Sequence, residues 1–143
     1  MSGIVIPLMA ERVVDFSGLS SSGLLDHVLA QRIPVHQWRQ MALIVRIHSL
    51  TINGTDGFSV EARLDSFTPE DPTIVWLSFN QNAGSVFINS STPSPTLLRV
   101  PIQTIGPAAW ASYGAVVARC NSGHTSGLPL RATISLSLEA KDA

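Results

Sequence analysis

The chain has 143 residues and a mass of 15.3 kDa, which is the size of one ordinary domain. Hydrophobic residues make up 45% and charged residues only 13%, so the composition is that of a globular protein and excludes a disordered chain. The formal net charge of −1 argues against nucleic acid and against an anionic membrane surface as partners. A single cysteine, Cys120, excludes an internal disulfide and fits a protein that folds in a reducing cytoplasm.

The N-terminal segment contains a short apolar run. Its hydrophobic residues are Ile4, Val5, Ile6, Leu8 and Met9. The run is too short for a signal peptide, and no stretch of the chain approaches the roughly 20 apolar residues of a membrane span. We therefore expect no membrane partner, and we divide the chain into residues 1–10, an apolar arm or first strand, and a β-sandwich domain over residues 11–143.

Turn-forming sequences cut the rest of the chain into short segments. The breaks fall at residues 18–23, 53–57, 68–72, 80–84, 89–96 and 121–127. They leave segments of about five to twelve residues, a spacing typical of a sandwich or barrel. One segment, residues 24–31, is compatible either with a helix or with a strand that runs on into residues 33–35, and residues 106–111 could form one helical turn.

The other segments predict strands. They cover residues 13–17, 41–52, 58–65, 73–79, 85–88, 97–104, 112–120 and 130–140. Residues 130–140 alternate between apolar and polar side chains over eleven positions, and residues 58–65 alternate in the same way. We expect hairpins through the breaks at 53–57 and 80–84. The predicted fold is a single all-β domain, an antiparallel, jelly-roll-like β-sandwich of eight to nine strands with little helix.

Residues able to perform catalysis or bind a metal do not form a recognisable motif. Cys120 and His124 are the closest Cys/His pair, whereas a zinc site needs three or four ligands. A hydrolytic enzyme would need a cleft in which His48 or His124 is hydrogen-bonded to a nucleophile. We expect no enzymatic activity, no cofactor and no metal.

Aromatic side chains allow two interpretations. Trp38, Trp76, Trp110 and Tyr113 can belong to the core or a subunit interface, or they can form a platform on which a sugar stacks. The residues we select as interface candidates are Ile4, Val5, Ile6, Leu8, Trp38, Arg46 and Trp110.

Four stretches carry a resemblance to a known class of proteins. They are residues 13–18 (VVDFSG), residues 33–39 (IPVHQWR), residues 42–48 (ALIVRIH) and residues 134–138 (ISLSL). In this order they resemble the small β-sandwich or jelly-roll virion proteins of tailed bacteriophages, such as capsid decoration (cement) proteins and minor head or tail proteins. The resemblance implies folding in the bacterial host cytoplasm, location in the virion, self-association (often as trimers), and binding to the major capsid protein or another virion protein. The alternative is a carbohydrate-binding β-sandwich module that uses surface Trp and Tyr side chains.

Overall fold

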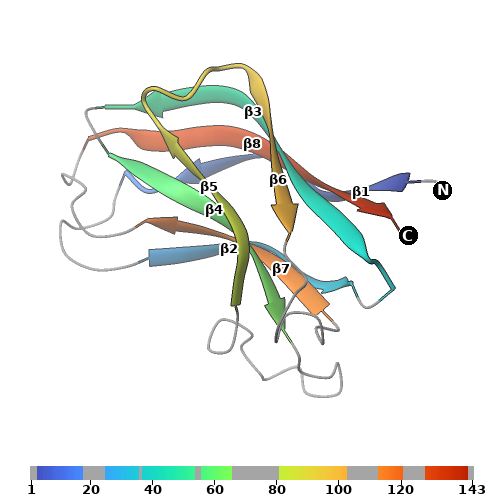
Figure 1. Ribbon diagram of the computed structural model, residues 1–143. Helices are drawn as coiled ribbons and strands as arrows, with labels where there is room; N and C mark the ends of the chain where they lie inside the picture. The colour runs from blue at the N-terminus through green and yellow to red at the C-terminus, as the bar shows by residue number, and fades with distance from the viewer. Residues whose placement is uncertain are drawn as a thin grey trace.

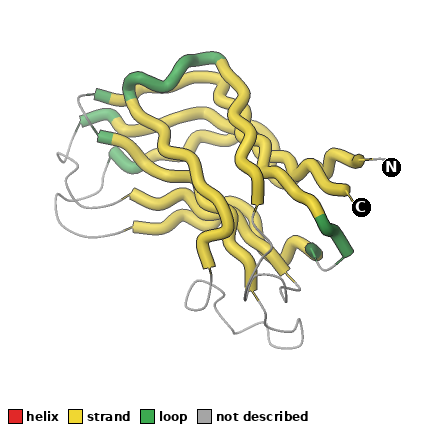
Figure 2. Tube along the Cα trace, in the orientation of Figure 1, coloured by secondary structure: helices red, strands yellow, loops and turns green. Residues whose placement is uncertain are grey.

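The structure, a computed structural model, describes residues 3–17, 25–35, 37–53, 56–65, 81–102, 113–120 and 128–141. Over these residues the chain forms eight β-strands and no helix (Figure 1; Figure 2). The strands are β1 (Gly3–Asp15), β2 (Leu25–Pro34), β3 (Gln40–Ile52), β4 (Gly57–Asp65), β5 (Gln81–Asn89), β6 (Thr96–Ile102), β7 (Tyr113–Cys120) and β8 (Leu130–Lys141).

The strands form two four-stranded antiparallel sheets, which we call sheet A (order β1-β8-β3-β6) and sheet B (order β2-β7-β4-β5). The pairing is nested, since β1 pairs with β8, β2 with β7, β3 with β6, and β4 with β5. The chain is therefore one long hairpin wrapped into two layers, which is the topology of a jelly roll. The prediction of an all-β, jelly-roll-like sandwich is confirmed.

The hydrophobic core lies between the two sheets and follows from the alternation of the interior strands. In β8 every second residue from Leu130 to Ala140 is at most 3% exposed, and the residues between them face outward. Phe58 and Val60 of β4 meet this layer from sheet B and are 0% exposed. Burial of each such large side chain contributes about 1.5–3 kcal/mol, so the alternating apolar residues hold the layers together.

The edge strands β1 and β2 depart from simple alternation because they contain bulges. In β1 the pairing with β8 shifts between Pro7 and Met9 and again between Met9 and Arg12. In β2 the pairing with β7 shifts twice between Val28 and Ile33, and Arg32 lies in the left-handed region with φ of 56°. The helical alternative for residues 24–31 is wrong, because residues 25–34 are a bulged strand.

Further expectations are corrected or lie outside the described residues. The hairpin expected through residues 53–57 is wrong, because β3 and β4 belong to different sheets. The turn expected at residues 80–84 is wrong, because β5 already begins at Gln81 and pairs with β4. Gly84 is a strand residue at a place where sheet A comes close, since a Cβ atom there would lie 2.7 Å from the carbonyl oxygen of Pro101. The strand expected at 73–79, the turn at 68–72 and the helical turn at 106–111 lie outside the described residues.

Candidate functional site

The predicted interface residues of the N-terminal segment divide into two groups. Residues 3–10 belong to β1 and pair with β8 of the same chain. Ile4 and Val5 are 43% and 65% exposed. Ile6 and Leu8 are half-buried and pack against a small cluster of buried residues that includes Leu138 and Ala140.

The same cluster receives one of the predicted tryptophans. Trp38 is half-buried against it, and its buried indole Nε1 has no hydrogen-bond partner among the described residues. Arg46 is exposed on the outer face of sheet A, whereas Trp110, Trp76 and the side chain of Tyr113 lie outside what the structure describes. The structure thus packs Ile6, Leu8 and Trp38 against the same buried cluster, whereas Arg46 lies on the outer face of sheet A.

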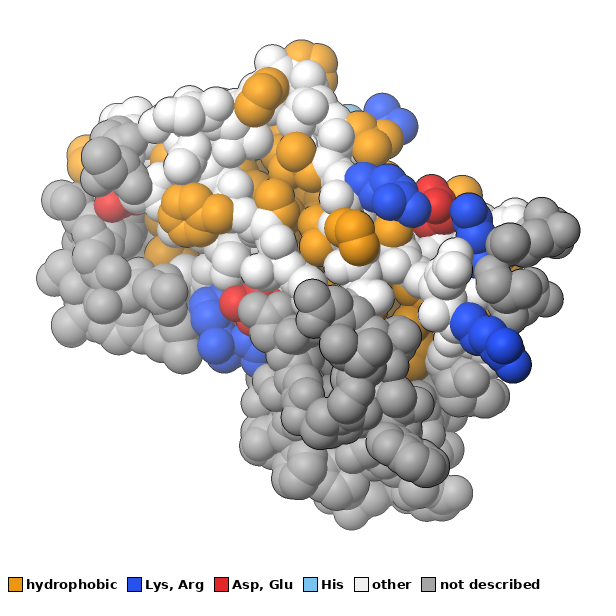
Figure 3. Space-filling view, viewed as in Figure 1, with side chains coloured by type: hydrophobic (Ala, Val, Ile, Leu, Met, Phe, Trp, Pro, Cys, Tyr) orange, Lys and Arg blue, Asp and Glu red, His pale blue; other side chains and the backbone are white. Residues whose placement is uncertain are grey.

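Large exposed apolar side chains gather at the edges of the sheets. Of the described residues, Val13 joins Ile4 and Val5 on β1 at 54% exposure, and Phe87 of β5 and Leu97 of β6 are 55% and 45% exposed. Hydrophobic side chains are visible on the side of the molecule where β5 and β6 lie (Figure 3). Because β1 and β6 are the two edges of sheet A, apolar surface is present at opposite ends of one sheet.

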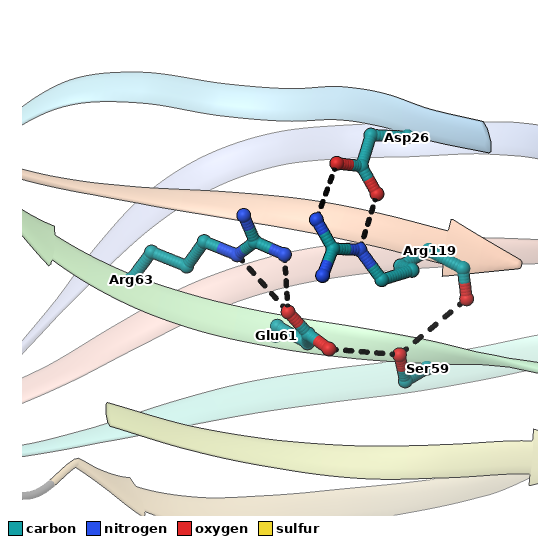
Figure 4. A network of polar contacts seen from close by, with 5 residues as sticks. All are labelled: Asp26, Ser59, Glu61, Arg63 and Arg119. Carbon is teal, nitrogen blue, oxygen red and sulfur yellow. Dashed lines mark hydrogen bonds and ion pairs between the residues drawn. The ribbon is translucent and has the colours of Figure 1, made fainter. Parts of the chain in front are cut away.

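A charged network crosses the outer face of sheet B (Figure 4). Arg119 of β7 donates two hydrogen bonds to Asp26 of β2, at 2.6 and 2.7 Å, and these bonds lower the pKa of Asp26. On β4, Arg63 donates to Oε2 of Glu61 at 3.0 and 2.6 Å, and both residues are buried. Ser59 links the two pairs, since its hydroxyl lies 3.2 Å from Glu61 Oε1 and 3.4 Å from the carbonyl oxygen of Arg119. The network contains two acidic and two basic side chains, so its formal charges cancel. It connects β2, β7 and β4, which are neighbouring strands of sheet B.

A second polar cluster lies on the outer face of sheet A. His48 Nε2 is 3.0 Å from the hydroxyl of Ser135, and His48 Nδ1 is 3.4 Å from Glu11 Oε1. The three residues come from β3, β8 and β1, so the cluster spans three adjacent strands. A histidine hydrogen-bonded to a nucleophile is the contact expected of a hydrolase.

None of the cavities lined by described residues supplies the cleft that would accompany such an enzyme. Three described cavities have volumes of about 40, 20 and 80 Å³, and none of them is lined by Ser135 or His48. A ligand pocket typically measures about 300–1,000 Å³. These cavities are too small to enclose a substrate.

The other candidates from the sequence form no site among the described residues. No group of three or more His, Cys, Asp or Glu side chains that could hold a metal occurs there. Cys120 is buried, its thiol lies 3.7 Å from the carbonyl oxygen of Gly57, and burial raises its pKa, which is opposite to the shift of a reactive thiolate. His124 is not among the described residues. Within that part of the chain, no helix has the length and apolar character needed to cross a membrane.

Sequence reasoning did not place Glu11, His48 and Ser135 together. The sequence of β3 contained one indication of the bulge. Its core-facing residues Leu43, Val45 and Ile47 are spaced two apart, whereas the next core-facing residue, the partly buried Leu50, follows after three. A change from a spacing of two to a spacing of three indicates one extra residue in the strand, that is, a β-bulge. The pairing of β3 with β8 does shift between Ile47 and Ser49, at His48. The partners Glu11 and Ser135 depend on strand order, which alternation does not reveal.

Comparison with known proteins gives a likeness of fold alone. No protein-family model and no curated protein matches the sequence. A solved structure of Desmodium yellow mottle tymovirus is similar at 8% sequence identity and a TM-score of 0.38, covering 97% of this chain and 84% of that chain.

Proposed function

We propose that the protein is a non-enzymatic structural component of a virion, of the bacteriophage decoration type, that self-associates and binds a capsid lattice. The observation that carries the proposal is the placement of exposed apolar side chains at both edges of sheet A, on β1 and on β6. Large apolar side chains left exposed along a sheet edge can be covered by a neighbouring copy, as exposed apolar surface is at interaction sites. The jelly roll occurs in viral capsid domains and also in lectins, so the fold alone does not decide between these functions.

The arrangement of the edges favours contacts between unlike surfaces of neighbouring copies. Each neighbouring pair in sheet A is antiparallel, so β6 runs antiparallel to β1. When β1 of one copy lies beside β6 of the next, the alternation of strand directions continues across the contact. Head-to-tail contacts form a ring when the rotation between copies closes and a filament when it does not; the trimer that we expect is a closed ring of three copies.

Side chains, more than backbone hydrogen bonds, carry this contact. β1 contains Pro7 and β6 contains Pro101, and proline has no backbone N–H to donate across an edge. The bulges of β1 also interrupt a continuous ladder. The exposed side chains Val5, Val13 and Leu97 are therefore the expected contacts. The expected partners are a second copy and the major capsid protein, with the virion as the final location.

Light scattering on a sizing column tests the self-association. We expect a mass near three times 15.3 kDa at micromolar concentration for the native chain. Val13→Lys on β1 and Leu97→Lys on β6 should each reduce the mass to that of a monomer, because a charge at the contact would be desolvated. Thr51→Lys is the matched control, since Thr51 is exposed on the interior strand β3, and it should leave the mass unchanged.

Mixing the two edge variants distinguishes a head-to-tail contact from a symmetric one. Each variant keeps one intact edge, so an equimolar mixture of Val13→Lys and Leu97→Lys should form dimers that grow no further. A native chain that stays monomeric, or edge variants that assemble like the control, would contradict self-association through these edges. Co-sedimentation with capsids then tests lattice binding by itself.

A further inference from the structure

The strongest unexplained feature is the cluster of Glu11, His48 and Ser135 on the outer face of sheet A. The two neighbours of β8, which are β1 and β3, each contain a β-bulge next to residues 133–136 of β8. On β1, Ala10 and Glu11 lie between the pairs Met9↔Leu136 and Arg12↔Ile134 and have no partner in the register. On β3, His48 lies between the pairs Ile47↔Ile134 and Ser49↔Thr133 and also has no partner in the register.

The bulges explain how the three side chains meet. A β-bulge bends the strand and redirects a side chain, and bulges are over-represented beside active sites. Glu11 and His48 are the bulged residues, and Ser135 lies between them on β8.

The contacts suit one tautomer of His48. In the neutral ring with the proton on Nδ1, that nitrogen faces Oε1 of the exposed Glu11 carboxylate at 3.4 Å. Nε2 is then the free acceptor, and the Ser135 hydroxyl, at 3.0 Å, donates to it. This is the order of contacts in which a histidine takes the proton from a serine nucleophile.

We propose that Ser135 is a nucleophilic acylation site, with His48 as its general base and Glu11 as the positioning residue. The acyl donor is an ester or a thioester with a small acyl group. Ser135 Oγ forms a bond to the carbonyl carbon while His48 Nε2 takes the hydroxyl proton. The bond to the leaving group then breaks, His48 returns the proton to the departing alcohol or thiol, and Ser135 keeps the acyl group as an ester.

The surroundings favour a single acylation over repeated turnover. Arg46 is exposed and is the register partner of Ser135 on β3, so both side chains leave the same outer face of sheet A. None of the three described cavities holds a substrate over Ser135, and β8 is an interior strand whose two neighbours pair with its backbone. The acyl group on Ser135 is therefore open to water, and one equivalent accumulates only because Ser135 attacks the activated donor faster than water attacks the resulting serine ester. This inference does not depend on the proposed assembly function.

The test uses the full chain and p-nitrophenyl acetate as the probe. We expect release of one equivalent of nitrophenolate and a mass increase of one acetyl group, mapped to Ser135 by peptide analysis. Ser135→Ala should lose this adduct. Ser137→Ala, two residues along the same outward face of β8, is the matched control and should keep it.

Variants of the other two residues separate chemistry from structure. His48→Gln should slow acetylation by about 100-fold, the size of a general-base contribution. Glu11→Gln should also slow it, and Glu11→Asp, which keeps the carboxylate, should recover part of the rate. Thermal melting of each variant reports whether the fold persists. Acetylation confined to Lys141 or the amino terminus, or labelling of Ser135 that survives His48→Gln, would overturn the proposal.

Discussion

Single residues on the outer face of sheet B show how charge is accommodated in a chain with few charged side chains. The Asp26 and Arg119 side chains are 17% and 28% exposed and are joined by two short hydrogen bonds. These bonds outweigh desolvation, so the pKa of Asp26 is lowered and that of Arg119 is raised. The residues lie 93 positions apart, so only the pairing of β2 with β7 reveals the contact.

Asp26→Asn is expected to lower the free energy of unfolding at neutral pH by about 2 kcal/mol, the value of hydrogen bonds to charged groups. A folded pKa below the ordinary value of 3.8 means that the pair stabilises the protein above that pH. This contribution disappears as the pH falls through the folded pKa, so the two proteins should become equally stable in acid. Urea unfolding of both proteins across this pH range measures the difference.

The control for this experiment is Glu139→Gln. Glu139 is paired with Arg99 at 2.7 Å, but the two side chains are 30% and 52% exposed. Solvent screens such a pair, so its loss should matter less than the loss of Asp26. A larger effect at Glu139 than at Asp26 would contradict the role given to the buried network.

At the scale of one element, β2 shows why the sequence left its secondary structure open. The apolar residues Val28 and Leu29 are adjacent, and the bulges between Val28 and Ile33 break the period of two. A strand with two extra residues therefore looks partly helical. β8 has no bulge of its own and alternates over its whole length, so it was predictable almost to its ends. Sequence reasoning identified regular interior strands better than bulged edge strands.

Arg32→Gly is expected to stabilise the protein. Arg32 is exposed, and its φ of 56° places a Cβ-bearing residue in the left-handed region, at a cost of roughly 1–2 kcal/mol. Glycine removes this strain, and its own entropic cost is about 0.5–1 kcal/mol, so a net gain of up to about 1.5 kcal/mol should appear in urea unfolding. Arg131→Gly, at an exposed position of β8, should instead destabilise; equal effects at the two positions would exclude strain at Arg32.

For the whole molecule, the nested pairing makes the first and last strands neighbours. β1 pairs with β8 along almost its entire length, from Gly3↔Lys141 to Asp15↔Arg131. Alternation predicted two apolar-faced layers, but it is the same in every sandwich, and the order of strands depends on contacts between distant residues. The fold class was therefore predictable, whereas the neighbours of each strand and the Glu11–His48–Ser135 cluster were not.

Removal of residues 1–10 is expected to destabilise the monomer as well as any assembly. The deletion takes away the strand that pairs with Leu136 to Lys141, together with the packing of Ile6 and Leu8. Full burial of such a side chain contributes about 1.5–3 kcal/mol, so two partly buried ones give a loss of roughly 2 kcal/mol. The control is the double change of the exposed Ile4 and Val5 to serine, which keeps the strand. Denaturant unfolding compares the three proteins, and an unaffected deletion variant would show that sheet A is stable without this part of β1.

The meeting of Gly3 and Lys141 also determines how the domain responds to force. Both residues lie at the same end of the β1–β8 ladder, and the two ends of the described chain emerge side by side (Figure 1). Tension applied between the termini pulls the two strands apart crosswise, so the hydrogen bonds open one after another, as in a zipper. Tension along β1 alone would load many of these bonds at once. The domain should therefore unfold at a lower force when it is pulled by its two termini than when the tension runs along β1.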